Sequence, residues 1–291
     1  MRIVPFKQVD VFTTRPFTGN PVAVVFGADG LDERAMQSLA SWTNLSETTF
    51  VLAPTVPGAD YRLRIFTPRQ ELPFAGHPSI GSAYAAIEAG WITARSEGLV
   101  QECGAGMLPI RIEREAGRTL LFVRVPKAQL ESSDLMLTHA LGRALGTALR
   151  DEPGPRPVNV GPTWIVADLE FAASVLALEP DMARLAALCR EQDAVGVTVF
   201  GRTGDPNVAL EVRSFAPADG IPEDPVCGSG NAAVAAYLHA NEQLPRGGSG
   251  YVVSQGARVG REGRVHVRVD NDGVIEIGGE AVTCVDGTIR L

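Results

Sequence analysis

Arg64-Ile65-Phe66-Thr67-Pro68 is followed closely by Pro73-Phe74-Ala75-Gly76-His77-Pro78, and the second half of the chain repeats this pattern. The repeat consists of Arg213-Ser214-Phe215-Ala216-Pro217 and then Pro225-Val226-Cys227-Gly228-Ser229-Gly230. In both halves a strand pattern is followed by a proline turn and then by a glycine that opens an alanine-rich helix. The second copy begins about half a chain length after the first, so we interpret the sequence as two similar halves.

The regions around these landmarks predict an α+β fold in which strands outnumber helices. Helical spacing is clearest at residues 32–42, 77–89, 180–190 and 228–240. Alternating or apolar runs predict strands at residues 8–12, 22–26, 49–52, 61–66, 108–112, 120–125, 158–166, 195–200, 208–215, 251–254, 265–269 and 274–277. The helices at 77–89 and 228–240 carry almost no charge, so other structure must enclose them. We therefore expect two β-barrels, each built around one central helix.

The length of 291 residues is about twice that of a common domain and favours two domains. We place the first barrel at residues 1–117, completed by a returning strand at 279–291, and the second barrel at residues 118–278. The Gly- and Pro-rich stretch Asp151–Pro157 could be a linker, but the aligned landmarks put it inside the second repeat. We therefore interpret it as a surface loop.

Composition excludes several classes of partner. The formal charge is −8 and Lys and Arg are scattered singly, so we expect no nucleic-acid or anionic-membrane binding. No apolar stretch reaches the roughly 20 residues that span a bilayer, and the first ten residues lack the apolar core of a signal peptide. With only four widely spaced cysteines, we expect a cytoplasmic protein.

The sequence also argues against a dinucleotide cofactor and a metal. No G-x-G-x-x-G leads from a strand into a helix, so NAD and FAD are not expected. The four histidines show no ligand spacing, so a metal site has little support. We expect no cofactor.

Gly76 and Gly228 each stand at a predicted helix start, where unpaired N–H groups and the helix dipole attract an anion. The alternative is that these glycines only permit close packing, but their paired occurrence favours a function. If the two halves face each other, both helix starts would point at one cleft, where a substrate carboxylate or a carbon acid developing negative charge would be stabilised. His77, in the first helical turn, is expected to be neutral because the dipole disfavours an imidazolium there, and alternatively it caps its own helix.

Glu47 lies between a predicted helix and a predicted strand, in Asn44-Leu45-Ser46-Glu47-Thr48-Thr49-Phe50. Burial there would raise its pKa toward neutrality, where one carboxyl group can take and return a proton, while the alternative is a solvated surface residue. Asp224 is either a proton-transfer group or a turn former before Pro225. Cys227 precedes a helix start, where the dipole would favour a thiolate, or it is a buried inert cysteine. The Cys103 motif, Glu102-Cys103-Gly104-Ala105-Gly106, falls in a predicted hairpin.

The chain resembles the PhzF-like family of phenazine-biosynthesis isomerases. The resemblance rests on five segments, of which Asn44-Leu45-Ser46-Glu47-Thr48-Thr49-Phe50-Val51 and the Arg64–Pro78 stretch are the most specific, and the others are 10–13, 17–24 and 223–230. It implies the diaminopimelate epimerase-like architecture, with two barrels related by a pseudo-twofold axis and the site between them. It also implies a homodimer.

The resemblance assigns roles to single residues. Glu47 would be the acid and base that moves a proton along a dihydro-hydroxyanthranilate skeleton, and His77 and Asp224 would transfer protons or position the substrate. Gly76, with Gly228-Ser229, would bind the substrate carboxylate, beside Cys227.

Cys227 is a departure from the close phenazine enzymes and leaves a second function open. A thiol there is similar to the bases of amino-acid epimerases and proline racemases, although the mirror position in the first half is Ala75, so a two-thiol racemase is not supported. We therefore hold three hypotheses: a Glu47-dependent isomerase, a Cys227-dependent epimerase or dehydratase of an amino or hydroxy acid, and a non-catalytic binder of small molecules.

Overall fold

The computed structural model describes residues 2–96, 98–115, 117–245 and 250–291. The chain folds into two compact units, Met1–Arg124 with Gly278–Leu291 and Val125–Ile277. Gly117, where the sequence analysis places the boundary, lies in the turn between the last two strands of the long first segment. Within the described residues, none of the helices has the length and apolar character needed to cross a membrane.

The first unit is a curled sheet around a helix. Its strands are β1 (Ile3–Val11), β2 (Asn20–Phe26), β3 (Glu47–Leu52), β4 (Tyr61–Phe66), β5 (Glu71–Leu72), β6 (Leu99–Cys103), β7 (Gly106–Glu115), β8 (Arg118–Arg124) and β18 (Ala281–Arg290). They pair in the order β18-β1-β2-β3-β4-β6-β7-β8, with β5 on the edge of β4. The pairs β2–β3 and β4–β6 are parallel and the others are antiparallel.

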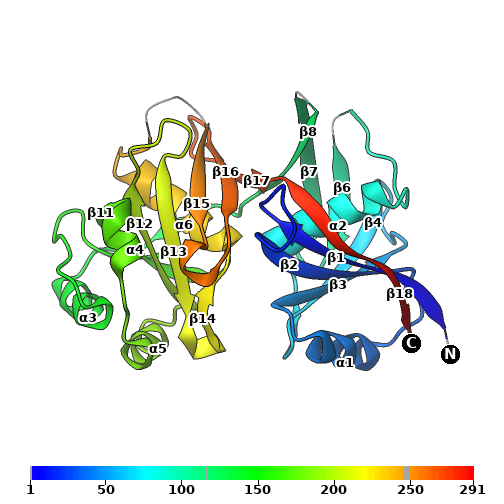
Figure 1. Ribbon diagram of the computed structural model, residues 1–291, viewed down its shortest axis with the longest axis horizontal. Coiled ribbons are helices and arrows are strands. Elements are labelled where there is room, and N and C mark those ends of the chain that lie inside the picture. The colour runs from blue at the N-terminus through cyan, green and yellow to red at the C-terminus, as the bar shows by residue number, and fades with distance from the viewer. Residues whose placement is uncertain (1, 97, 116, 246–249) are drawn as a thin grey trace. The chain divides into compact units, whose positions relative to one another are not determined.

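Helix α2 (Gly76–Glu88) fills this barrel, and α1 (Glu33–Thr43) lies outside it (Figure 1). α2 packs against β1, β2, β3 and β4 and also against β8 and β18 at the far ends of the strand order. A helix that touches both ends of one sheet is enclosed by it, which explains why α2 carries so little charge. α1 instead buries one face, including Met36 and Leu39, against Phe50 and Phe66 of the sheet.

The second unit repeats this plan. Its strands are β9 (Gln129–Leu130), β10 (Arg156–Asn159), β11 (Thr163–Phe171), β12 (Gly196–Arg202), β13 (Leu210–Ala216), β14 (Ile221–Asp224), β15 (Gly250–Gln255), β16 (Gly263–Val269) and β17 (Ile275–Gly279), whose last two residues belong to the first unit. The pairs β11–β12 and β13–β15 are parallel, as are β2–β3 and β4–β6 in the first unit. Central helix α6 (Gly228–Ala240) packs on β10, β11, β12 and β16. The expected fold, two strand barrels around central helices, is confirmed.

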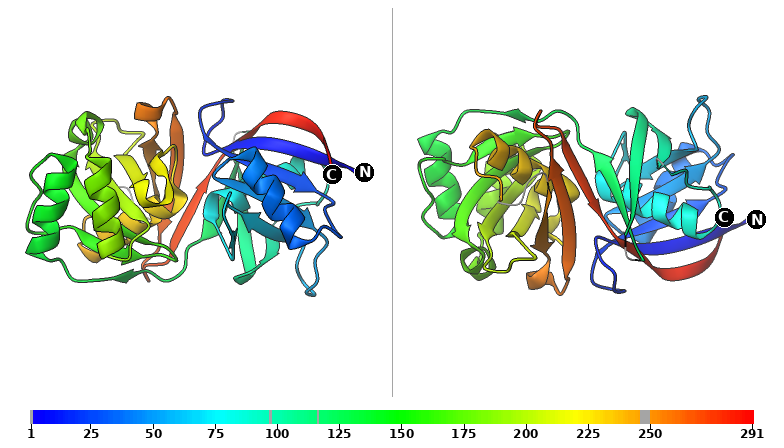
Figure 2. Two further views of the ribbon diagram at one scale, coloured as in Figure 1. Left: turned by 90° about the horizontal axis from the view of Figure 1, so that it is seen from below. Right: turned by 90° about the horizontal axis from the view of Figure 1, so that it is seen from above.

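The outer layer of the second unit contains α3 (Leu135–Leu145), α4 (Ala172–Ala177) and α5 (Met182–Glu191), which Figure 2 shows from two further sides. Of these, only α5 is predicted by the helical spacing of the sequence, at residues 180–190. Two single-turn 3₁₀ helices, Pro217–Asp219 and Ala257–Val259, complete the unit. The strand predicted at 158–166 is wrong as a single element, because Gly161, with φ +110°, turns the chain back and separates β10 from β11.

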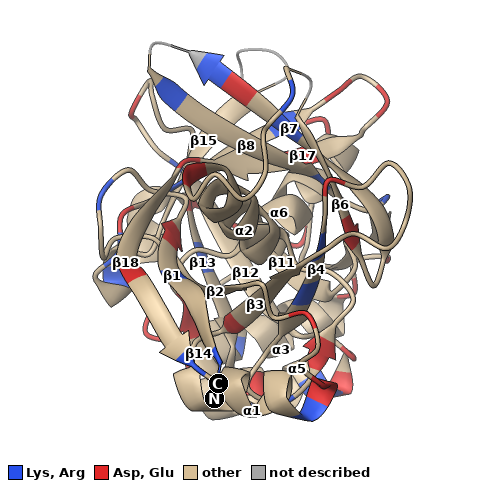
Figure 3. Ribbon diagram, turned by 90° about the vertical axis from the view of Figure 1, so that its right-hand side faces the viewer, with Lys and Arg blue, Asp and Glu red and all other residues tan. Residues whose placement is uncertain are grey.

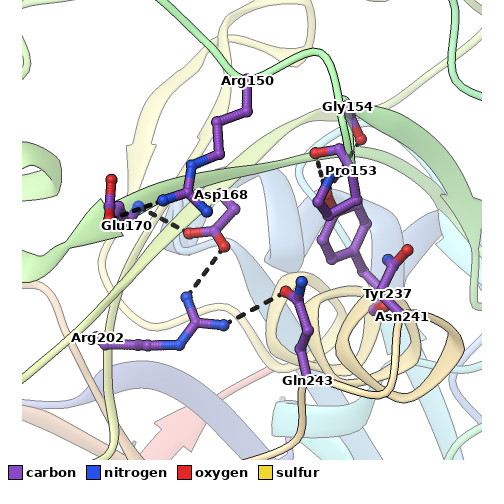
Figure 4. A network of polar contacts seen from close by, with 9 residues as sticks. All are labelled: Arg150, Pro153, Gly154, Asp168, Glu170, Arg202, Tyr237, Asn241 and Gln243. Atoms are coloured by element: carbon purple, nitrogen blue, oxygen red, sulfur yellow. Dashed lines mark hydrogen bonds and ion pairs between the residues drawn. The ribbon is translucent and has the colours of Figure 1, made fainter.

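A network of polar contacts fixes the C-terminal end of α6 (Figure 4). The buried Tyr237 hydroxyl donates to the carbonyls of Pro153 and Gly154 at 2.9 and 3.1 Å, which anchors the loop before β10. Beside it, Asp168 of β11 accepts a 3.0 Å bond from Arg202 of β12. Each buried polar group here has a protein partner, so the network holds strands and helix together.

Acidic and basic residues are interspersed along the elements in the view of Figure 3. Arg64 pairs with Glu71 and Glu33, and Lys7 pairs with Glu88 and Asp286. These charges of the first unit therefore form local ion pairs.

Gly81 lies where α2 crosses the sheet, and we expect Gly81→Ala to destabilise the protein. An added Cβ would lie 2.5 Å from Cγ1 of Val22 and 2.8 Å from Cγ2 of Val11, both stiff, fully buried side chains. Overpacking costs about 1–3 kcal/mol, against a helix-propensity gain of about 1 kcal/mol. We expect the free energy of unfolding, measured in denaturant, to fall by about 1 kcal/mol, the middle of the resulting range.

Gly287→Ala is the matched control, because its Cβ would meet no atom within 4 Å. Equal stability of the two variants would contradict the close packing of α2 on β1 and β2.

Candidate active site

Glu47 is the first residue of β3, and the end of α1 places it there. The N–H of Asn44 makes the last helical bond, to the carbonyl of Ala40. Asn44 itself has a left-handed conformation, with φ 53°, and this conformation ends the helix. The hydroxyls of Thr43 and Thr48 lie 2.7 Å apart and bridge the turn between helix and strand. The turn therefore sets the position of Glu47 next to β2.

Glu47 is partly buried, with 15% of its side chain exposed, and its Oε2 atom is shielded from solvent. Burial raises its pKa to about 7, although a hydrogen bond with the Ser46 side chain opposes that rise. Of the two interpretations of Glu47, the structure supports the buried carboxyl rather than the solvated one. Such a group can give up and recover a proton at neutral pH.

His77 lies in the first turn of α2 and faces Glu47. Its Nε2 atom is 3.4 Å from Oε2 of Glu47, and its side chain is 8% exposed. The two atoms are near, yet their geometry is not that of a formed hydrogen bond. Pro78 follows within the first helical turn, where a missing N–H breaks no helix bond. The structure thus brings together an acid and an imidazole that are far apart in sequence.

The start of α2 offers backbone donors beside this pair. Its N-cap is Ala75, which makes no side-chain cap, and no acidic residue lies in its first turn. A Cβ on Gly76 would lie 3.7 Å from Val123, an ordinary contact, so packing does not require this glycine. The first N–H groups and the positive end of the dipole are therefore suited to an anion.

A buried polar chain, not foreseen from the sequence, holds the start of α2. The Ser79 hydroxyl donates to the carbonyl of Ala75 at 2.8 Å and accepts from the Gln101 amide at 3.0 Å. Gln101 in turn accepts a 2.8 Å bond from the Tyr61 hydroxyl. These buried bonds fix the position of the helix start relative to β4 and β6.

In the second unit, Gln255 at the end of β15 holds the start of α6, as Gln101 helps to hold the start of α2. Its Oε1 accepts from the backbone N–H of Cys227 at 3.1 Å and from the Asn231 amide at 2.8 Å. Its Nε2 donates to the carbonyl of Asp224 at 3.2 Å. An alignment of the two halves would have paired Gln101 with Gln255. In each half the glutamine lies on the strand after the central helix, and this strand is parallel to the R-x-F-x-P strand.

Asp224 forms the turn into α6. Its Oδ1 accepts a 3.0 Å bond from the N–H of Val226, across Pro225. This is the turn-forming role considered for Asp224 in the sequence analysis. A role in proton transfer stays a prediction.

Cys227 is the N-cap of α6 and is 5% exposed. Its Sγ accepts the N–H of Gly230 at 3.2 Å. Burial, together with the nearby Asp224 carboxylate, raises the pKa of the thiol well above its usual value. The raised pKa favours the alternative, a buried inert cysteine, over a thiolate stabilised by the helix dipole.

Ser229 and Gly228 form the first turn of α6. The Ser229 side chain is partly exposed, and its Oγ accepts a 3.0 Å bond from the indole N–H of Trp164 on β11. Glu47, His77 and Gly76 thus cluster in the first unit, and Asp224, Cys227, Gly228 and Ser229 in the second. Among the described residues, no three His, Cys, Asp or Glu side chains converge in a way that could hold a metal ion.

Comparison with known proteins first defines the fold class. A hydroxyproline epimerase from Agrobacterium vitis, solved with trans-4-hydroxy-L-proline, superposes with a TM-score of 0.66 over 100% of this chain and 93% of that one, at 16% identity. The fold is therefore the diaminopimelate epimerase-like fold. A family model for phenazine biosynthesis-like proteins, PhzC-PhzF, matches residues 9–287, and the chain belongs to this family.

Relatives match along their whole length. Antisense-enhancing sequence 1 of Schizosaccharomyces pombe is 43% identical over 97% of each chain. A trans-2,3-dihydro-3-hydroxyanthranilate isomerase of Pseudomonas aeruginosa is 35% identical over 98% of this chain and 99% of its own. A PhzF-family phenazine biosynthesis protein of Bacillus anthracis superposes with a TM-score of 0.87 at 28% identity over 100% of both chains. These similarities support an isomerase.

Proposed function

We propose that the protein is a cofactor-independent isomerase that moves a proton between two carbons of a small carboxylate substrate. The observation that carries the proposal is the buried Glu47 carboxyl, with a pKa of about 7, 3.4 Å from His77. A compound like trans-2,3-dihydro-3-hydroxyanthranilate, named for the Pseudomonas aeruginosa relative, fits this chemistry. Such a protein would act as a homodimer, as the family resemblance implies.

In the proposed reaction the Glu47 carboxylate removes a proton from a saturated carbon. The electron pair of the broken C–H bond enters the adjacent π system, and a new C–H bond forms when protonated Glu47 returns the proton to another carbon. No atom is gained or lost, and no oxidant is needed. His77 would hold or pass a proton on a substrate heteroatom, a role that Asp224 would share.

Backbone donors would stabilise the charge that develops. The first turn of α2, opened by Gly76, lies next to the acid and presents N–H groups without a side-chain cap. Preorganised donors of this kind are often the largest single contribution to catalysis. The first turn of α6, with Gly228 and Ser229, would bind the substrate carboxylate in the same way.

Deuterium incorporation tests this function. The wild-type protein is incubated in heavy water with trans-2,3-dihydro-3-hydroxyanthranilate and with a panel of amino and hydroxy acids, and proton signals are followed by NMR. We expect isomerisation of the first compound, or of one with the same functional groups. Deuterium should appear at the newly protonated carbon to the extent that protonated Glu47 exchanges its proton with heavy water before returning it. Saturable binding of a compound without exchange or turnover would instead favour the non-catalytic binder.

The pH dependence of kcat/KM should report the ionisation of Glu47. Because only the carboxylate removes the proton, kcat/KM should fall about tenfold per pH unit below pH 7, where the carboxyl is protonated. The measurement is initial rates from pH 5 to 9. A profile that is flat between pH 5 and 7 would contradict Glu47 as the base.

Cys227→Ser separates the isomerase from the thiol-dependent epimerase. Serine keeps an acceptor for the Gly230 N–H, and the buried thiol is protonated, so we expect turnover within about threefold of the wild type. The readout is the initial rate, with circular dichroism as the folding control. A loss of more than a hundredfold in a folded variant would favour the thiol mechanism.

A further inference from the structure

Trp164 is a buried residue of β11 that the proposed reaction does not use directly. It is 4% exposed, and its indole N–H donates to Oγ of Ser229, 3.0 Å away. An indole nitrogen is only a donor, so the direction of this bond is fixed. Ser229 must accept, and its own proton is directed elsewhere.

The thiol of Cys227 also approaches the same hydroxyl. Its Sγ lies 3.6 Å from Oγ of Ser229 and already accepts the N–H of Gly230. A serine oxygen has two acceptor sites and one proton. Either atom can be the donor in the contact between Sγ and Oγ. Because the indole N–H occupies one acceptor site of Ser229, the Ser229 O–H points away from the indole, where it can donate to Sγ of Cys227 or turn to a ligand.

The position of the indole is built into the sheet. Trp164 is opposite Gly196 in the parallel pairing of β11 and β12. A Cβ at Gly196 would lie 2.5 Å from Cζ3 of Trp164 and 2.3 Å from the carbonyl oxygen of Phe215, so only glycine permits this approach. The Trp164 ring therefore packs against the backbone at Gly196, and its N–H points to Ser229 at the start of α6.

We propose that Trp164 is a positioning residue that fixes the Ser229 hydroxyl as a hydrogen-bond donor and so makes the start of α6 selective for an ionised carboxylate. This rests on the proposed function, because Ser229 is the residue proposed to bind the substrate carboxylate. Trp164 would act only through Ser229. A carboxylate accepts a stronger bond from this hydroxyl than the matching carboxamide does.

The bond itself is tested without any ligand. The protein has three tryptophans, Trp42, Trp91 and Trp164, so its indole N–H region should show three signals in a ¹⁵N correlation spectrum. Trp164→Phe assigns one of them. In Ser229→Ala that signal should shift upfield and exchange faster with heavy water, while the other two stay in place. An unmoved Trp164 signal in Ser229→Ala would overturn the proposal.

The selectivity is tested with anthranilate and anthranilamide, which differ in the carboxylate. Trp164→Phe should raise the Kd of anthranilate about tenfold and that of anthranilamide less than threefold, and the same loss should appear in KM for the substrate rather than in kcat. Trp42→Phe, at a side chain that is 76% exposed, is the control and should change neither Kd.

The double variant separates positioning from packing. If Trp164 acts through Ser229, then Trp164→Phe should add nothing to the loss already present in Ser229→Ala. An equal further loss in that background would overturn the proposal in favour of packing. If the wild-type protein binds neither anthranilate nor the substrate, the carboxylate site of the proposed function is refuted. The selectivity assigned to Trp164 is then refuted as well. The indole signal in Ser229→Ala still shows whether the hydrogen bond exists.

Discussion

Glu47→Gln should lower the rate of proton transfer by about a thousandfold while leaving the fold and the affinity for the substrate in place. Glutamine has the size of the neutral carboxyl group but can neither remove nor return a proton. General acid–base catalysis by one side chain contributes about 10² to 10⁴ in rate, and here one group performs both steps. The expected loss is therefore in kcat, with KM nearly unchanged.

The measurement is the initial isomerisation rate together with deuterium incorporation, which should disappear in the variant. Glu33→Gln is the matched control, because Glu33 lies at the start of α1 with 73% of its side chain exposed. It should retain full activity. Undiminished deuterium uptake in Glu47→Gln would show that another group moves the proton.

The repeated landmarks made the two barrels predictable, because each landmark is local. A strand, a proline turn and an uncharged helix are specified by neighbouring residues, and the enclosure of such a helix follows from its lack of a polar face. Tyr61–Phe66 and Gly228–Ala240 have the predicted bounds. Both halves follow the same local pattern, and their parallel strand pairs agree, β4 with β6 and β13 with β15.

α3 was missed although its ends carry readable signals. Asp134 caps its start through the N–H of Met136, and Gly146 ends it in a left-handed conformation. Apolar residues lie on several sides of α3, and two of them, Leu135 and Met136, are exposed. Gly142 further interrupts the periodic pattern of apolar residues. The helical period is therefore obscured, and only the caps could have indicated the helix.

The sequence indicates which residues could form the site, but not which of their side chains come into contact. A buried acid at Glu47 could be considered from its sequence position, but its approach to His77 depends on β3 and α2 packing together inside one barrel. The hydrogen bond from Trp164 to Ser229 likewise depends on tertiary structure. Desolvation of Cys227, which raises its pKa, depends on burial by the whole unit and cannot be seen in the sequence around the helix start.

The second large effect is on stability, and it follows from the same carboxyl group. Glu47 has a pKa of about 7 in the folded protein and an ordinary value near 4.5 in the unfolded chain. Between these values the folded state keeps a proton that the unfolded state has released, so stability is lost as the pH rises. Below pH 4.5 both states are protonated, and the penalty vanishes.

Glu47→Gln removes this titration, so the variant should become more stable than the wild type as the pH increases. Each pH unit between the two pKa values contributes about 1.4 kcal/mol, which gives a difference of about 3 kcal/mol at pH 8 and little at pH 4.5. The measurement is the free energy of unfolding in urea for both proteins from pH 4.5 to 8. Glu33→Gln, with its exposed carboxylate, should follow the wild type. If the stability curves of the wild type and Glu47→Gln stay parallel over this range, the pKa of Glu47 is not raised. The carboxyl could then not both lose and regain a proton near neutral pH, as the proposed proton transfer requires.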